Sequence, residues 1–144
     1  MARCSVAGRT SAVPTAARGP SLYATSGVRP RIREVGVFNT TATAVAVALA
    51  RATTTGTQGA ALTAVNESDP THAVIATPFN THTADATVGA PVRRAMLGAA
   101  IGSGVIWTFG EDGFVINDGT SNGLVITCPV GTGQHLDFYI CWDE

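Results

Sequence analysis

The hydrophobic residues of the segment TAVAVALAR, residues 43–51, recur at every second position. Val45, Val47 and Leu49 are the large side chains, and alanines separate them. In a helix Val45 and Leu49 would share a face that excludes Val47, whereas in a strand all three lie on one face and the alanines on the other. The pattern therefore predicts a β-strand over 44–51, although alanine and leucine are good helix formers.

Short apolar runs with the same strand-like character occur along the rest of the chain. The sequence predicts further strands over 32–38, 72–79, 104–110, 114–116, 124–130 and 135–142. We expect 32–38 and 44–51 to be antiparallel strands joined at 39–43, and Pro78 to mark an edge or a strand end. Residues 89–104 fit either a weak strand or one helical turn. Seven or eight strands separated by turns indicate an all-β fold, an antiparallel β-sandwich that is jelly-roll-like.

The first 30 residues lack this periodicity. Prolines at 14, 20 and 30 and glycines at 8, 19 and 27 interrupt them. Such a segment is typical of extended or disordered chain. We therefore predict an extended N-terminal arm over 1–30, followed by a single β-sandwich domain over 31–144, a length suited to one domain.

Charge is unevenly distributed along the chain. Residues 1–51 carry seven arginines and one acid, a net charge of +6, whereas 52–144 carry two arginines and nine acids, a net charge of −7. A nucleic-acid-binding arm would have denser charge and more aromatic residues than the single Tyr23. We therefore expect the arm to contact an acidic protein, and Arg18, Arg29, Arg31 and Arg33 are its candidate contact residues.

The low overall charge points to self-association. Only 13% of the residues are charged, about half the usual fraction. A surface this neutral suits a protein packed against other proteins, or equally an ordinary soluble β domain. Alanine side chains allow a neighbour to approach closely, so Ala44, Ala46 and Ala48 form the candidate subunit-contact face. Closed rotational symmetry would bury such a face without leaving a free end.

Candidate catalytic and metal-binding residues are sparse. Ser103, His135 and Asp137 could form a nucleophilic set, but no surrounding motif supports them. His72, His82 and Asp85 could hold a metal, although nine residues between the two histidines match no common ligand spacing. We therefore predict that the protein is not an enzyme and has neither a cofactor nor a metal site.

The cysteines and the apolar segments indicate the cellular environment of the protein. Cys4, Cys128 and Cys141 are odd in number and lack a C-x-x-C pair, which argues against a disulfide framework. Cys128 and Cys141 fall in strand-like runs and are expected to be buried thiols. Apolar segments of membrane-spanning length are absent from the sequence, so we expect a protein without membrane contact, made under reducing conditions.

Two stretches of the chain resemble a known class of proteins. The stretches IREVGVFNTTATAVAVALARATTTGTQGAALTA (32–64) and NGLVITCPVGTGQHLDFYICWDE (122–144) are similar to small structural proteins of tailed bacteriophages, in particular head decoration, or cement, proteins. The resemblance covers roughly residues 20–144. It implies a jelly-roll-like domain, usually a homotrimer, that binds the major capsid protein and stabilises the shell. Its location would be the capsid exterior, after assembly in the host cytoplasm.

Two alternatives remain open at this stage. The chain could be another virion component, from a tail, neck or fibre. It could instead be a carbohydrate- or receptor-binding sandwich in which Trp107, Trp142 or Tyr139 stacks on a ligand. Both tryptophans fall on the apolar side of their predicted strands, which favours core packing for them.

Overall fold

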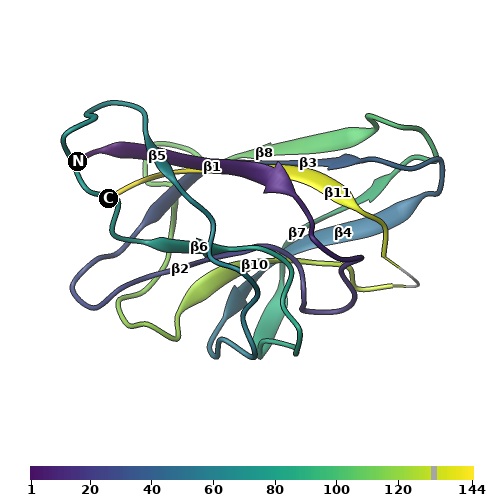
Figure 1. The fold of residues 1–144 in the computed structure, drawn as a ribbon, viewed down its shortest axis with the longest axis horizontal. Coiled ribbons are helices and arrows are strands. Elements are labelled where there is room, and N and C mark those ends of the chain that lie inside the picture. The colour runs from purple at the N-terminus through teal and green to yellow at the C-terminus, as the bar shows by residue number, and fades with distance from the viewer. Residues whose placement is uncertain (131–132) are drawn as a thin grey trace.

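Two antiparallel sheets pack face to face in the computed structural model, which describes residues 1–130 and 133–144 (Figure 1). The strands are β1 (Arg3–Arg9), β2 (Ser21–Tyr23), β3 (Arg31–Asn39), β4 (Val45–Ala52), β5 (Val65–Asn66), β6 (Thr77–Phe79), β7 (Val88–Leu97), β8 (Gly104–Thr108), β9 (Phe114–Val115), β10 (Gly123–Thr127) and β11 (Leu136–Asp143). The described residues contain no helix, and hence none that could span a membrane. The predicted all-β sandwich is confirmed.

The strands divide between a six-stranded sheet I and a five-stranded sheet II. Sheet I has the order β5-β1-β11-β3-β8, with β9 also paired to β3, and sheet II has the order β6-β2-β10-β4-β7. The chain alternates between the sheets for its first six strands, as expected of a jelly-roll-like fold. Strands β7 and β8 are consecutive and lie at the edges of different sheets, so both edges open on the same side of the sandwich.

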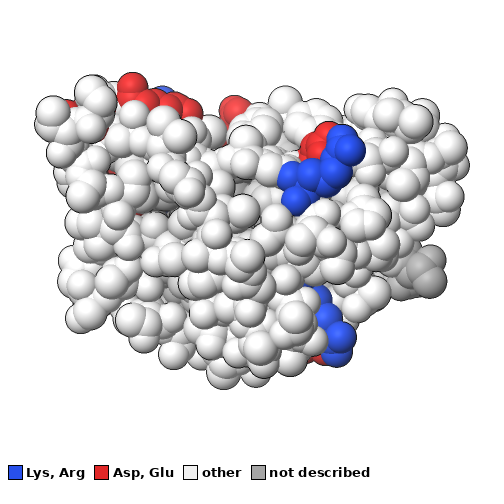
Figure 2. All heavy atoms as spheres, in the orientation of Figure 1, with Lys and Arg blue, Asp and Glu red and all other residues white. Residues whose placement is uncertain are grey.

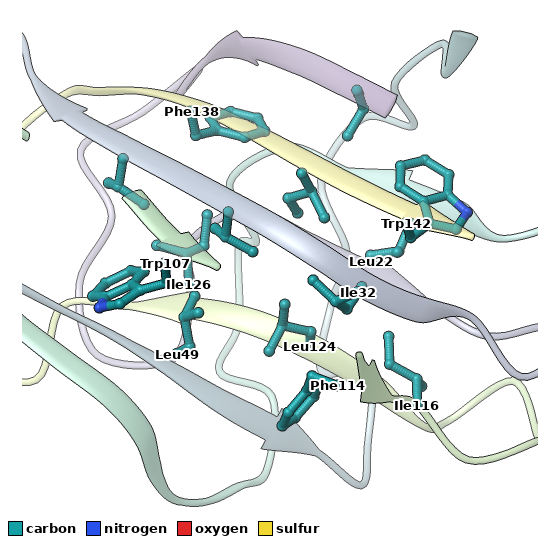
Figure 3. Close-up of a cluster of buried hydrophobic side chains, with 14 of the residues drawn as sticks. Leu22, Ile32, Leu49, Trp107, Phe114, Ile116, Leu124, Ile126, Phe138 and Trp142 are labelled. Carbon is teal, nitrogen blue, oxygen red and sulfur yellow. The ribbon is translucent and has the colours of Figure 1, made fainter. Parts of the chain in front are cut away.

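The predicted inward faces form the core. Val45, Val47 and Leu49 of β4 are at most 2% exposed, and the inward side chains of β11 are at most 3% exposed. Figure 3 shows side chains from both sheets pointing into the space between them. The labelled residues are Leu22, Ile32, Leu49, Trp107, Phe114, Ile116, Leu124, Ile126, Phe138 and Trp142. Each such large side chain contributes about 1.5–3 kcal/mol when fully buried.

Residues 1–30 do not form an arm outside the sandwich, so the predicted boundary at residue 30 is wrong. Strand β1 pairs with β11 over seven residues and also with β5, and β2 lies between β6 and β10. Cys4 and Val6 point into the core and are at most 2% exposed. The two ends of the chain meet, because Ala2 and Glu144 exchange backbone hydrogen bonds of 2.7 and 3.0 Å (Figure 1).

The link between β3 and β4 also differs from the prediction. Both strands form where expected, but β3 belongs to sheet I and β4 to sheet II, so they do not pair with each other. Asn39 organises the crossing, since its side-chain amide donates to the carbonyls of Thr43 and Gly98 at 2.6 and 3.0 Å. The undecided segment 89–104 lies largely in strand β7, and the 72–79 prediction shortens to β6, an edge strand as Pro78 indicated.

Candidate interaction surface

Ion pairs between early arginines and later acids neutralise part of the charge asymmetry. Arg9 of β1 binds both carboxylate oxygens of Asp137 on β11, at 2.6 and 2.9 Å, and Arg18 reaches Asp85 at 3.3 Å. Figure 2 shows the result on one face of the molecule, where charged atoms occupy a few small patches on a mostly uncharged surface. The antiparallel pairing of β1 with β11 thus places basic and acidic segments side by side.

Asp143 is the most connected of these acids. Its side chain is 8% exposed and accepts hydrogen bonds from the guanidinium groups of Arg3, at 3.1 Å, and Arg33. Burial alone would raise the pKa of this carboxyl, but the hydrogen bonds and positive charges of Arg33 and Arg3 outweigh it and leave the pKa below its usual value. Arg33 also donates to the carbonyls of Gly110 and Glu111. These contacts fix the end of β11 against β1 and β3.

The four arginines proposed as arm contacts therefore separate into two groups. Arg18 and Arg33 are held by Asp85 and Asp143 of their own chain. Arg29 and Arg31 line a hollow of about 320 Å³ with Asp112 and Val115, and no ion pair holds them among the described residues. Because residues 1–30 do not form a separate arm, the predicted contact of a basic arm with an acidic protein loses its structural basis.

The proposed alanine contact face is also corrected. Ala46 and Ala48 are 3% and 0% exposed, and only Ala44, which precedes β4, is exposed. The register places Ala48 between Thr127 of β10 and Arg94 of β7, and places Ala46 beside Met96. Thr127 is itself only 5% exposed, so this part of the outer face of sheet II is covered within the protomer. A neighbouring subunit could not reach the two alanines without displacing part of the protomer.

Exposed apolar side chains occur along a different part of the surface. Met96 of β7, Ile101 of the connecting turn and Ile106 of β8 are 67%, 76% and 53% exposed. We call the region formed by residues 88–108 the β7–β8 side. Met96 lies opposite Ala46 and Ile106 opposite Gly36, so Met96 is on the outer face of sheet II and Ile106 on the outer face of sheet I, with Ile101 in the turn that connects the two edges. Apolar side chains exposed to this extent mark a surface suited to contact with another protein.

The β7–β8 side also has backbone edges without a neighbouring strand. Strand β7 spans ten residues and pairs only with β4, while β8 pairs only with β3, so each leaves one edge without a neighbouring strand in the described chain. Such an edge offers N–H and C=O groups to a partner. Pro91 and the charged Arg93 and Arg94 interrupt it, and these are features that oppose unlimited edge-to-edge aggregation. The combination fits a specific partner better than open-ended stacking.

Arg93 also helps to close the sandwich between the two open edges. It lies opposite Leu49 in the register, and its guanidinium group is 5.3 Å from the centre of the Phe109 ring. On the same side, Arg51 lies 3.8 Å from the centre of the Phe114 ring. In these cation–π contacts the two arginine side chains cover aromatic rings at the boundary of the core, and their guanidinium groups remain in contact with water.

The aromatic residues considered for ligand stacking have structural roles. Trp142 is fully buried and donates from Nε1 to Glu144, and Trp107 is 9% exposed within the core. Tyr139 donates to Glu34 at 2.6 Å, and its ring crosses Gly36 so closely that a Cβ there would lie 2.1 Å from a ring carbon. Burial and the Glu34 carboxylate both raise the pKa of this phenol. Its ring is also stacked on Phe38.

The residues of the two candidate chemical sets bind different partners. Ser103 accepts from the Gly98 N–H, His135 contacts Thr10, and Asp137 binds Arg9. His82 is buried against Ser21, with 2.7 Å between Nε2 and Oγ. His72 instead lies 3.7 Å from the buried carboxylate of Glu144, and Asp85 binds Arg18. Among residues 1–130 and 133–144, no group of three acidic, histidine or cysteine side chains is placed to hold a metal ion.

The cysteines are poor nucleophiles in this environment. Burial raises the thiol pKa of Cys4, Cys128 and Cys141 to about 11, so all three are protonated at neutral pH. Cys128 is a core residue as expected, and Cys4, which was predicted to lie in the arm, is a core residue as well. Cys141, also expected to be buried, is only half-buried and lies on the outer face of sheet I. The three thiols are free.

Comparison with known proteins yields no relative. No protein-family model, curated protein or solved structure matches the chain.

Proposed function

We propose that this protein is a non-enzymatic structural component of a tailed-bacteriophage virion, a decoration or cement protein that binds the major capsid protein on the outside of the shell. The observation that carries this proposal is the β7–β8 side, where Met96, Ile101 and Ile106 are exposed beside two open strand edges. The resemblance of the sequence to decoration proteins points to the same role. The β7–β8 side replaces the N-terminal arm as the surface of attachment.

The mechanism is stabilisation by binding. A protein that binds only the assembled lattice lowers the free energy of that lattice relative to its dissociated subunits. Burial of the three apolar side chains would supply part of the affinity, and backbone hydrogen bonds along β7 would fix the orientation. Arg94 is exposed on β7, so an acidic contact patch on the capsid protein would complement this surface.

Self-association into a homotrimer belongs to the same proposal. Its contact surface has to lie outside the alanine row of β4, since Ala46 and Ala48 are buried within the protomer. A tail, neck or fibre position would use the same kind of surface. Light scattering on the purified protein measures the number of copies, and the structure of the intact particle gives their position.

Binding to shells tests the proposal. Empty shells assembled from the phage's major capsid protein are mixed with the protein, sedimented and heated. The wild type is expected to co-sediment and to raise the melting temperature of the shells. Replacing Ile101 or Ile106 by glutamate should weaken binding by at least about tenfold, because each change places a charge in an apolar contact.

Val65→Glu is the matched control. Val65 is 59% exposed on β5, at the edge of sheet I opposite β8, so it resembles Ile106 in exposure and position on an edge strand. This variant should bind shells like the wild type. Absence of wild-type binding would contradict the capsid role, and a loss confined to Val65→Glu would show that the attachment surface is wrongly placed.

A further inference from the structure

An uncharged hollow lies beside β2 and β6, at the edge of sheet II opposite β7. It measures about 360 Å³, within the range of small-molecule sites, and four segments of the chain surround it. The lining residues are Tyr23, Ala24, Thr25, Thr55, Gln58, Thr77, Phe79, Thr120 and Ser121. None of the nine is charged, so the hollow has no counter-charge to offer an ionic ligand.

The polar groups of the hollow are hydroxyls and one amide. Thr25 donates to the Ile75 carbonyl at 2.8 Å, which fixes the loop after β2. Within the described chain, no side-chain hydrogen bond engages Gln58, Thr77 or Ser121, so these groups are free to bond to a ligand. A hydroxyl both donates and accepts, and a carboxamide does so through two separate atoms.

Two aromatic rings form the apolar part of the wall. The rings of Tyr23 and Phe79 meet edge to face with 6.2 Å between their centres, and Phe79 is only partly buried. The Tyr23 hydroxyl donates to the Thr54 carbonyl at 3.1 Å, and His82 packs 6.0 Å from its ring. These contacts hold the rings in one position before any ligand arrives, which reduces the entropy lost on binding.

Gly123 is required for this arrangement. It lies opposite Tyr23 in the β2–β10 register, and a Cβ at this position would lie 2.6 Å from a Tyr23 ring carbon. The ring can therefore lie across the strand only because residue 123 has no side chain. On the far side, the loops after β2 and before β10 are joined by hydrogen bonds from the Ala24 N–H to Asn122 and from the Gly27 N–H to Asp118 (Figure 1).

We propose that this hollow binds an uncharged saccharide. A sugar ring presents hydroxyls that both donate and accept, which matches the threonine, serine and glutamine groups. Its C–H face packs on an aromatic ring, which matches Phe79. Sheet II has the order β6-β2-β10-β4-β7, so the hollow and the β7–β8 side are at opposite edges. Saccharide binding therefore does not depend on the capsid role.

The test uses purified full-length protein and an array of neutral and anionic glycans, with isothermal titration of every hit. Neutral glycans are expected to bind and anionic ones to be absent among the hits. Phe79→Ala should weaken binding by about tenfold or more, because it removes the stacking surface. Ser121→Lys is the second variant, since Ser121 is exposed and a lysine there obstructs the rim without disturbing the core.

Ile106→Glu, on the β7–β8 side, is the control and should leave glycan affinity unchanged while it reduces shell binding. Circular dichroism establishes that each variant is folded. Binding of a neutral glycan that Ser121→Lys reduces supports the proposal. Absence of glycan binding, binding of anionic glycans only, or affinity unaltered in both hollow variants would overturn it, and none of these results bears on attachment to shells.

Discussion

Asp143 shows how a single residue connects segments that are far apart in the sequence. Its carboxylate is buried at the end of β11 and forms ion pairs with Arg3 of β1 and Arg33 of β3. Removing an arginine from this group leaves the buried carboxylate without part of its compensation, which costs more than the loss of a surface ion pair. The exposed pair Arg9–Asp137 has similar geometry but lies in water, where ion pairs contribute little.

Replacing Asp143 by asparagine should lower the free energy of unfolding by on the order of 2 kcal/mol at pH 7. Because the folded-state pKa of Asp143 is depressed, its contribution is complete above the unfolded value near 4 and declines as the pH falls below it. Urea unfolding from pH 7 to pH 3 should therefore show the difference between wild type and variant shrinking below about pH 4.

Asp137→Asn serves as the control for that series. Its expected effect is about 0.5 kcal/mol or less, because both partners of the Arg9–Asp137 pair are largely exposed. Equal losses in the two variants, or an Asp143→Asn difference that stays constant down to pH 3, would contradict the role assigned to Asp143.

Among the elements, the strands with apolar or branched runs were predictable, whereas β1, β2 and β5 were not and β7 was left undecided. The runs that became β4, β8 and β11 carry large apolar side chains at every second position, and the run that became β3 is rich in branched residues. Strand β1 has the same period, but cysteine, valine and glycine provide its inward positions, a signal too weak to stand out among prolines and arginines. Its place in the sheet depends on pairing with β11, more than 120 residues away.

The candidate surfaces were harder to predict for a related reason. Alternation correctly separated the two faces of β4, but it could not show that Ala46 and Ala48 are buried on the outer face, beside Thr127, Arg94 and Met96 of neighbouring strands. Likewise, the hollow combines four segments whose proximity follows from strand order. A sequence pattern reports which side of a strand a residue occupies, and only the register shows what stands beside it.

Strand β1 can be tested as part of the core with one matched pair of variants. Val6→Asp should destabilise the protein by about 3 kcal/mol or more, because it buries a charge without a partner. Val13→Asp should change stability by less than about 0.5 kcal/mol, since Val13 is 45% exposed outside any strand. Thermal unfolding followed by circular dichroism measures both. An N-terminal arm outside the domain would instead make the two variants equally mild.

For the whole molecule, the strand order separates two surfaces. One side of the sandwich has the open edges of β7 and β8 with exposed Met96, Ile101 and Ile106, and the other has the neutral hollow beside β6. Ion pairs between four early arginines and three later acids compensate part of the charge asymmetry seen along the chain. The proposed arrangement attaches one side to a protein lattice and leaves the other accessible to a ligand.

Amide hydrogen exchange of the protein, free and bound to shells, tests the attachment surface most directly. Alternate N–H groups of an edge strand point away from its single partner and exchange readily in the free protein. The account predicts that binding slows exchange in residues 88–108 and leaves β5 and β6 unchanged. Protection confined to β5 and β6, with β7 and β8 exchanging as in the free protein, would contradict it.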